Sequence, residues 1–171
     1  SHHLIQSNFL IDVDGVLNTG QFIYNKNGKF GKIFGPDDND ALKILSEFIN
    51  IQFITSDKRG FEISKKRITT DMGFKLKYIE NKKRIKWITN NFDLKKTIYM
   101  GDGIFDWILM KSIFFSISCS DSNDLARKHS KYVTKAKSGN RAVSEACFFI
   151  LKKFFIKKNI EKIIIKYLNK K

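Results

Sequence analysis

The chain has few of the residues that commit a protein to a disulfide-rich, zinc-binding or membrane-spanning class. It contains one proline and two cysteines among 171 residues. Cys119 and Cys147 lie far apart and form no Cys-X-X-Cys pair, so neither a disulfide framework nor a zinc site is expected. The densest apolar stretches, 113–117 and 147–151, are far shorter than the roughly 18 residues of a membrane span. With no secretory signal visible, we expect a cytoplasmic protein without a membrane partner.

Acidic residues are also scarce, 17 against 32 basic residues, which gives a net charge of +15. Such a charge suggests a nucleic-acid partner. However, only five of the basic residues are arginine, the residue that phosphate and base clamps favour. We therefore assign most of the charge to solvated surfaces, and note that it also attracts a small anionic substrate. With 42% hydrophobic residues, the chain can bury the core of one domain.

Short apolar runs alternate along the chain with stretches of helical period. This alternation predicts βαβ units, and therefore a Rossmann-like three-layer α/β/α sandwich with a central parallel sheet. An Asn27-Gly28 pair between two aromatic-rich runs predicts a β-hairpin insertion over residues 21–34, after the first strand. The predicted strands span 8–13, 51–55, 76–79, 97–100, 114–118 and 132–133, and the predicted helices span 36–49, 60–72, 82–91, 105–111, 123–129 and 141–153.

The last residues of the chain form a separate pattern. Apolar residues recur at helical spacing among lysines between 156 and 171, which predicts an amphipathic helix that packs on the domain or on a sister subunit. We therefore divide the chain into a catalytic-type domain over 4–153 and a helical tail over 154–171. The apolar face of this tail is expected to contain Ile160, Ile163, Ile164, Tyr167 and Leu168.

Four aspartates follow two of the predicted strands. Asp12 and Asp14 close the first strand, and Asp102 and Asp106 follow the strand 97–100. Ligands of parallel sheets bind beyond the carboxyl ends of the strands, so these carboxylates are expected to lie close together. Converging carboxylates repel each other unless a cation or a proton lies between them, and Mg²⁺ prefers such oxygen ligands. A single aspartate at a strand end is more often a turn or helix cap; the group of four predicts a Mg²⁺ site.

These aspartates belong to motifs that occur in a known order. Residues 9–20, Phe-Leu-Ile-Asp-Val-Asp-Gly-Val-Leu-Asn-Thr-Gly, resemble the first motif of the haloacid dehalogenase superfamily, an apolar strand followed by DxDG. Residues 54–56, Ile-Thr-Ser, resemble the second motif, a strand that ends in Thr or Ser, and Lys83 lies at a helix start as in the third. Residues 101–106, Gly-Asp-Gly-Ile-Phe-Asp, resemble the fourth. The resemblance covers about residues 8–150.

The resemblance implies a phosphatase that works through an aspartyl phosphate. Asp12 would be the nucleophile, and Asp14 the acid/base that protonates the leaving alcohol and then activates water. Mg²⁺ would be held by the carboxylates of Asp12 and Asp102 and the backbone carbonyl of Asp14, with Asp106 acting through water or orienting its neighbours.

The phosphoryl oxygens would be held by Thr55, Ser56 and Lys83. For Lys83 an alternative stays open, because Lys82 and Arg84 adjoin it and any of the three could be a solvated helix residue.

The spacing between the motifs leaves no room for a lid domain, so the resemblance is to a capless subgroup. The hairpin at 21–34 resembles that of the 3-deoxy-octulosonate 8-phosphate phosphatases and the nonulosonate 9-phosphate phosphatases, which implies a homotetramer assembled through the hairpin. Residues 35–41 and 138–145 also resemble stretches of that subgroup, which makes Asp38 and Arg141 candidates for the substrate side of the site.

Departures from the subgroup leave the substrate open. Ser56-Asp57 stands in place of Gly-Arg, Gly103 in place of an aspartate, and Asn140-Arg141 in place of Arg-Gly. We expect a phosphorylated sugar acid used in the synthesis of lipopolysaccharide or capsule. Two alternatives remain: a nucleic-acid-directed phosphatase or binding module, and a catalytically weak regulatory subunit of a sugar-activation pathway.

Overall fold

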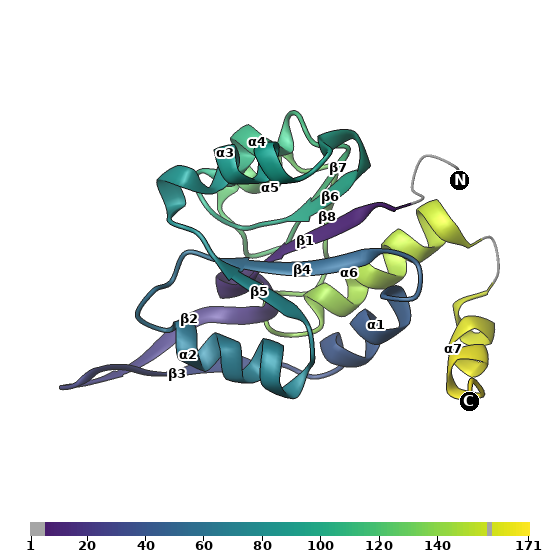
Figure 1. Cartoon of the computed structure of the whole chain (residues 1–171), viewed down its shortest axis with the longest axis horizontal. Helices are drawn as coiled ribbons and strands as arrows, with labels where there is room; N and C mark the ends of the chain where they lie inside the picture. The colour runs from purple at the N-terminus through teal and green to yellow at the C-terminus, as the bar shows by residue number, and fades with distance from the viewer. Residues whose placement is uncertain (1–5, 157–158) are drawn as a thin grey trace.

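The computed structural model describes residues 6–156 and 159–171, so the predicted domain start at residue 4 and residues 157–158 of the predicted tail lie outside the described residues. A six-stranded parallel sheet forms the centre of the fold, with strand order β5-β4-β1-β6-β7-β8 (Figure 1). This confirms the predicted Rossmann-like α/β architecture. The strands are β1 (Asn8–Asp12), β4 (Asn50–Thr55), β5 (Lys75–Tyr78), β6 (Thr97–Met100), β7 (Phe115–Ser118) and β8 (Tyr132–Val133).

Helices cover both faces of the sheet (Figure 1). On one face lie α1 (Asp38–Leu45) and α6 (Ala142–Ile150), which pack on each other and whose apolar residues join one core cluster. On the other face lie α3 (Asn81–Asn91), α4 (Asp106–Met110) and α5 (Asp124–His129), whose residues join a second cluster. Further helical segments are α2 (Phe61–Lys65), η3 (Lys66–Asp71), η4 (Leu94–Lys96) and η5 (Leu151–Phe155).

The two core clusters follow from the period of the central strand. Side chains alternate between the faces of a strand. In β1, Phe9 and Ile11 enter the cluster beneath α1 and α6, whereas Leu10 enters the cluster beneath α3 and α4. All three side chains are fully buried. Because both faces of β1 are covered, its end is held rigidly, and this end carries the first motif.

A two-stranded antiparallel hairpin follows β1 and projects from the body of the domain (Figure 1). It consists of β2 (Asn18–Asn25) and β3 (Gly28–Phe34), so the predicted hairpin is present and its first strand begins earlier than expected. Asn25 pairs with Gly28, which makes Lys26 and Asn27 the two turn residues instead of Asn27 and Gly28. Gly28 has φ +113°, a conformation that residues with a side chain rarely adopt. The need for glycine there determines where the turn lies.

An irregular turn, η2 (Val13–Leu17), connects β1 to the hairpin, and the sequence did not predict it. Asp14 and Gly15 leave helical geometry here, and Gly15 has φ +79°. A Cβ at Gly15 would lie 2.0 Å from a carboxylate oxygen of Asp102, so only glycine lets the two loops approach this closely. The turn thereby brings the first and fourth motifs into contact.

The chain ends in α7 (Ile160–Leu168). Ile163 is buried in the core cluster beneath α1 and α6. The same cluster is contacted by Ile160, Ile164 and Tyr167. Leu168 was expected on this apolar face but is 71% exposed. No helix among the described residues is long and apolar enough to cross a membrane.

Candidate active site

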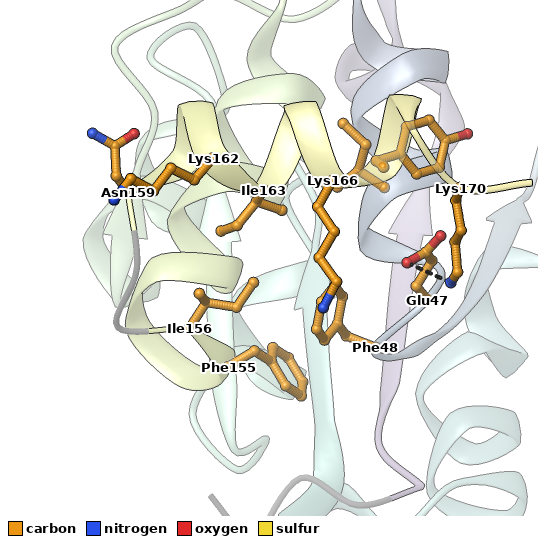
Figure 2. A pocket seen from close by; sticks show the side chains of 11 residues that line it. Glu47, Phe48, Phe155, Ile156, Asn159, Lys162, Ile163, Lys166 and Lys170 are labelled. Atoms are coloured by element: carbon orange, nitrogen blue, oxygen red, sulfur yellow. Dashed lines mark ion pairs between the residues drawn. The ribbon is translucent and has the colours of Figure 1, made fainter.

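One cavity lies beside α7, and its lining among the described residues holds no group of converging carboxylates (Figure 2). Its volume is about 810 Å³, and its walls are mostly aliphatic and aromatic. The one carboxylate in its lining, Glu47, already pairs with Lys170 at 3.1 Å. Phosphoryl chemistry requires converging carboxylates, so the described lining of this cavity does not fit the predicted site.

Another cavity, of about 420 Å³, opens at the carboxyl ends of β1, β4 and β6, where the sequence predicted the chemistry. The structure brings the three residues of the predicted Mg²⁺ site, Asp12, Asp14 and Asp102, to this one cavity. Ser56 lines it as well, as predicted for a residue near the phosphoryl group. The carboxylates in its lining are Asp12, Asp14, Asp57, Asp102 and Asp106.

Asp12 lies at the buried end of β1. Its Oδ1 accepts a hydrogen bond from the backbone N–H of Val13 at 2.9 Å. Carboxylate oxygens of Asp12, Asp102 and Asp106 lie within 4.8 Å of one another. Burial raises the pKa of Asp12, and the charge of Arg84 opposes this rise. Burial and then the charge of Asp12 raise the pKa of Asp102 to about 10, so the carboxylates cannot all be ionised without a cation.

Asp14 is held from the side of the hairpin. Its Oδ1 accepts hydrogen bonds from Asn18 Nδ2 at 2.9 Å and pairs with Lys32 Nζ at 2.8 Å. Its Oδ2 accepts a longer bond, 3.4 Å, from the hydroxyl of Thr55. Thr55 is fully buried and does not line the cavity. Its hydroxyl oxygen also accepts a hydrogen bond from the backbone N–H of Asp57. Thr55 therefore contacts the predicted acid/base.

Asp106 accepts hydrogen bonds that fix its orientation beside Asp102. Its Oδ2 accepts the backbone N–H groups of Asp102 and Gly103 at 3.0 and 2.8 Å. Its Oδ1 accepts the hydroxyl of Tyr99 at 2.6 Å. Because both oxygens are engaged, Asp106 braces the loop that carries Asp102. Its carboxylate belongs to the cluster of possible metal ligands, and the Asp14 carboxylate does not.

Lys83 was predicted to hold the phosphoryl group, but the structure turns it away from the cavity. Its side chain is 76% exposed and pairs with Glu80 at 3.4 Å. Arg84 lines the cavity instead: Nη1 lies 3.2 Å from Asp12 Oδ1, and Nη2 donates to Ser56 Oγ at 2.8 Å. The helical period could have identified it, because Arg84 precedes the buried Ile88 by one helical turn.

Asp38 and Arg141, the predicted substrate-side residues, lie outside the cavity lining. Asp38 is 1% exposed, and its Oδ1 accepts the N–H of Ser144, so it caps α6 from a neighbouring element. Burial raises its pKa to about 6. Arg141 pairs with Asp37 at the surface, with Nε 2.6 Å from Oδ2. Both residues join α1 to α6, so their contacts are structural ones outside the cavity.

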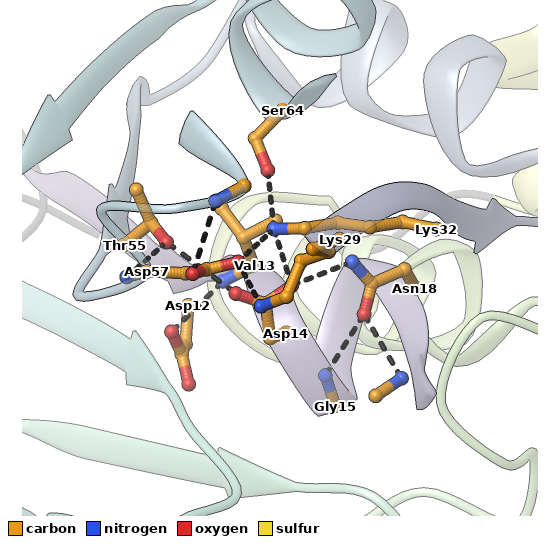
Figure 3. A network of polar contacts seen from close by, with 12 residues as sticks. Asp12, Val13, Asp14, Gly15, Asn18, Lys29, Lys32, Thr55, Asp57 and Ser64 are labelled. Atoms are coloured by element: carbon orange, nitrogen blue, oxygen red, sulfur yellow. Dashed lines mark hydrogen bonds and ion pairs between the residues drawn. The ribbon is translucent and has the colours of Figure 1, made fainter. Parts of the chain in front are cut away.

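Two hairpin lysines that the sequence did not predict complete the network (Figure 3). Lys29 Nζ lies 2.7 Å from Asp57 Oδ2, and Lys32 Nζ lies 2.9 Å from the same oxygen. Burial alone would raise the pKa of Asp57, but the hydrogen bonds from the two lysines outweigh it and lower this pKa to about 2. Asp57 is thus ionised and fastens the hairpin to the loop after β4.

The charges fit a divalent cation. Five carboxylates line the cavity, and the basic groups paired with them are Lys29, Lys32 and Arg84. Two negative charges are left over, which is the charge that one divalent cation balances. The donor set consists of carboxylate oxygens, the ligands of a hard cation such as Mg²⁺.

The chain is similar in sequence and in structure to known phosphatases and hydrolases. No known family profile matches the chain. The 3-deoxy-D-manno-octulosonate 8-phosphate phosphatase of Escherichia coli is 26% identical over 148 residues, which cover 83% of this chain and 77% of that protein. A structure described as a HAD superfamily hydrolase of subfamily III A, from Legionella pneumophila, has a TM-score of 0.79 at 22% identity and covers 98% of this chain and 92% of that one.

A further solved structure resembles the chain over nearly its whole length. It is the 3-deoxy-D-manno-octulosonate 8-phosphate phosphatase of Moraxella catarrhalis, in complex with a magnesium ion, a phosphate ion and the sugar acid KDO. It has a TM-score of 0.80 at 26% identity and covers 98% of this chain and 95% of that one. With its motifs in order and their aspartates at one cavity, these similarities support a phosphatase of the haloacid dehalogenase superfamily, in the subgroup of the octulosonate 8-phosphate phosphatases.

Proposed function

We propose that the protein is a Mg²⁺-dependent phosphomonoesterase that hydrolyses a phosphorylated sugar acid, of the 3-deoxy-octulosonate 8-phosphate or nonulosonate 9-phosphate type. The observation that carries the proposal is the meeting of Asp12, Asp14 and Asp102 at one cavity. The similar proteins from Escherichia coli and Moraxella catarrhalis are octulosonate 8-phosphate phosphatases by name, which supports this substrate class.

In the proposed reaction an oxygen of Asp12 attacks phosphorus, and the bond from phosphorus to the leaving alcohol oxygen breaks. Asp14 gives its proton to that oxygen, and then takes a proton from the water that hydrolyses the aspartyl phosphate. Asn18 and Lys32 hold one oxygen of Asp14, so its other oxygen is the one we assign to proton transfer. Asp12 is oriented by the N–H of Val13 and by Arg84.

We assign Mg²⁺ to Asp12, Asp102 and the backbone carbonyl of Asp14, with Asp106 as the residue that braces Asp102. When bound, the ion supplies positive charge against the phosphoryl oxygens. Arg84 is the residue we propose for the phosphoryl contact that Lys83 was expected to make, and Ser56 is its neighbour in the cavity lining.

The test is a turnover screen of purified protein with Mg²⁺ against phosphorylated sugar acids, neutral sugar phosphates and nucleotides. We expect phosphate release from the sugar acids, and in Asp12→Asn a loss on the order of a thousandfold or more with an unchanged thermal midpoint. Asp71→Asn is the matched control, because Asp71 is exposed and pairs only with the exposed Lys66 among the described residues. Activity retained in Asp12→Asn would exclude it as the nucleophile.

We also propose that the hairpin assembles the protein into a homo-oligomer, as a tetramer. Five large apolar side chains of the hairpin are between 41% and 56% exposed, and such a surface is costly to leave in water. Sedimentation velocity tests this: a monomer at micromolar concentration would contradict it. The residues concerned are Phe22, Ile23, Tyr24, Phe30 and Ile33.

A further inference from the structure

We propose that Lys29 is a substrate-binding residue that recognises the carboxylate of the sugar acid, and that Asp57 holds the Lys29 ammonium in the cavity. The inference rests on the proposed function, because it assigns a specificity residue to that same site. It concerns the part of the substrate that leaves, and not the phosphoryl group that Asp12 attacks.

The two hairpin lysines differ in how many N–H donors of their ammonium groups are left without an acceptor. Lys32 lies within 2.9 Å of three acceptors, Asp14 Oδ1, Asp57 Oδ2 and Ser64 Oγ, and its side chain is fully buried. An ammonium has three N–H groups, so Lys32 is saturated. Lys29 has one acceptor among the described residues, Asp57 Oδ2 at 2.7 Å. Two of its N–H groups remain for a ligand.

The position of Lys29 places its ammonium group at the cavity. Lys29 is part of the cavity lining, next to Phe22, whose ring centroid lies 3.7 Å from Nζ. Its side chain is only 6% exposed, so the aliphatic stem and the ammonium are held in place. A fixed, poorly solvated ammonium with spare donors is suited to a carboxylate, because charge-assisted hydrogen bonds are strongest where water is excluded.

A β-bulge brings both lysines to the same side of the hairpin (Figure 3). Residues three apart on a regular strand point to opposite faces. Here Tyr24 pairs with Lys29 and Ile23 pairs with Gly31, so Phe30 is an extra residue that reverses the alternation. Lys29 and Lys32 therefore both reach Asp57.

The loop after β4 is shaped to receive these two side chains. A Cβ at Gly60 would lie 2.3 Å from Asp57 Oδ2, 2.7 Å from Lys32 Cε and 2.9 Å from Lys29 Cδ. The N–H of Gly60 also donates to Asp57 Oδ1 at 3.1 Å, which leaves Oδ2 for the lysines. Glycine at this position gives the lysine stems and the carboxylate room to meet.

The experiment compares two esters of equal chain length, 6-phosphogluconate and glucitol 6-phosphate, of which only the first carries a carboxylate. We expect Lys29→Met to raise KM for 6-phosphogluconate by roughly 10- to 100-fold, and to lower the preference for it over glucitol 6-phosphate by about tenfold or more. Lys29→Arg should restore much of the preference. Lys26→Met is the matched control, since Lys26 is an exposed turn residue of the same hairpin.

Four results decide the matter, with thermal midpoints measured to exclude unfolding. An equal loss on both esters, or no loss on either, would overturn the role of Lys29 and leave the phosphatase assignment intact. A loss confined to the carboxylate ester, rescued by Lys29→Arg, would support it. If wild-type protein with Mg²⁺ hydrolyses neither of these esters nor octulosonate 8-phosphate, the proposed function falls, and this inference falls with it.

Discussion

The two walls of the cavity are held in different ways. The inner wall consists of Asp12, Asp102 and Asp106 at the ends of β1 and β6, strands that are buried on both faces. The outer wall consists of hairpin residues that one carboxylate, Asp57, fastens to the loop after β4. The inner wall therefore depends on the core of the sheet, and the outer wall on a few ion pairs. This difference suggests that chemistry and substrate choice can change independently.

Removal of the metal should have the largest effect and act on the inner wall alone. Exhaustive chelation should lower phosphate release from every substrate by about a thousandfold or more, because the crowded carboxylates then hold protons and the phosphoryl charge is not neutralised. Added Mg²⁺ should restore turnover. Full activity after chelation, with metal content checked by atomic spectroscopy, would contradict the assigned cation.

Arg84→Lys should have the next largest effect. The variant keeps the charge but loses the fork that reaches Ser56, Asp12 and Tyr99, so we expect kcat to fall by roughly 10- to 100-fold. Lys83→Met is the control and should change kcat by less than about twofold, because Lys83 is largely solvated. If the two variants exchanged these results, the phosphoryl contact would belong to Lys83.

Asp57→Asn should loosen the outer wall while the inner wall persists. Two buried ammonium groups lose their shared carboxylate, so we expect faster amide hydrogen exchange in β2 and β3 and unchanged exchange in β1. The rise in KM for a sugar acid phosphate should be several-fold, smaller than in Lys29→Met. Unchanged exchange in the hairpin would show that Asp57 does not fasten it.

The smallest effect concerns a residue remote from both walls. Burial raises the pKa of Asp38 to about 6, so the folded protein keeps a proton that the unfolded chain releases near pH 4. The stability linked to this proton is full below about pH 4 and is lost as the pH rises through 6, to an extent of about 2 to 3 kcal/mol. In Asp38→Asn this loss should vanish, as measured by urea unfolding at pH 4 and pH 7. Turnover should stay within about twofold, because Asp38 does not line the cavity.

The sequence predicted the sheet and the inner wall because both depend on local patterns. The strand at Thr97–Met100 was predicted to the residue, and the aspartates followed strand ends that share one edge of the sheet. Lys83 lies outside the cavity lining, which the sequence did not indicate, because three adjacent basic residues match a motif equally well and only the buried face of α3 distinguishes Arg84. Asp38 and Arg141 were inferred from resemblance alone, and their partners lie across the interface between α1 and α6.

The outer wall could not be predicted from the sequence, because it depends on which residues of β2 and β3 pair with each other. Nothing in the sequence around Phe30 indicates that this residue lacks a partner in β2, and a regular strand would separate Lys29 from Lys32. In the sequence, Asp57 stands where the similar phosphatases have an arginine, which by itself indicates only the loss of a positive charge. In the structure it is the acceptor for two lysines that approach from a distant part of the chain.

The unpaired residue at position 30 has an evolutionary consequence. Insertions and deletions in hairpins are tolerated far better than changes in a buried sheet. Loss of one residue there would turn one of the two ammonium groups outward, while Asp12, Asp102 and Asp106 at the strand ends would keep their places. A lineage could thus exchange one phosphate ester for another through a single codon deletion, without passing through an inactive ancestor.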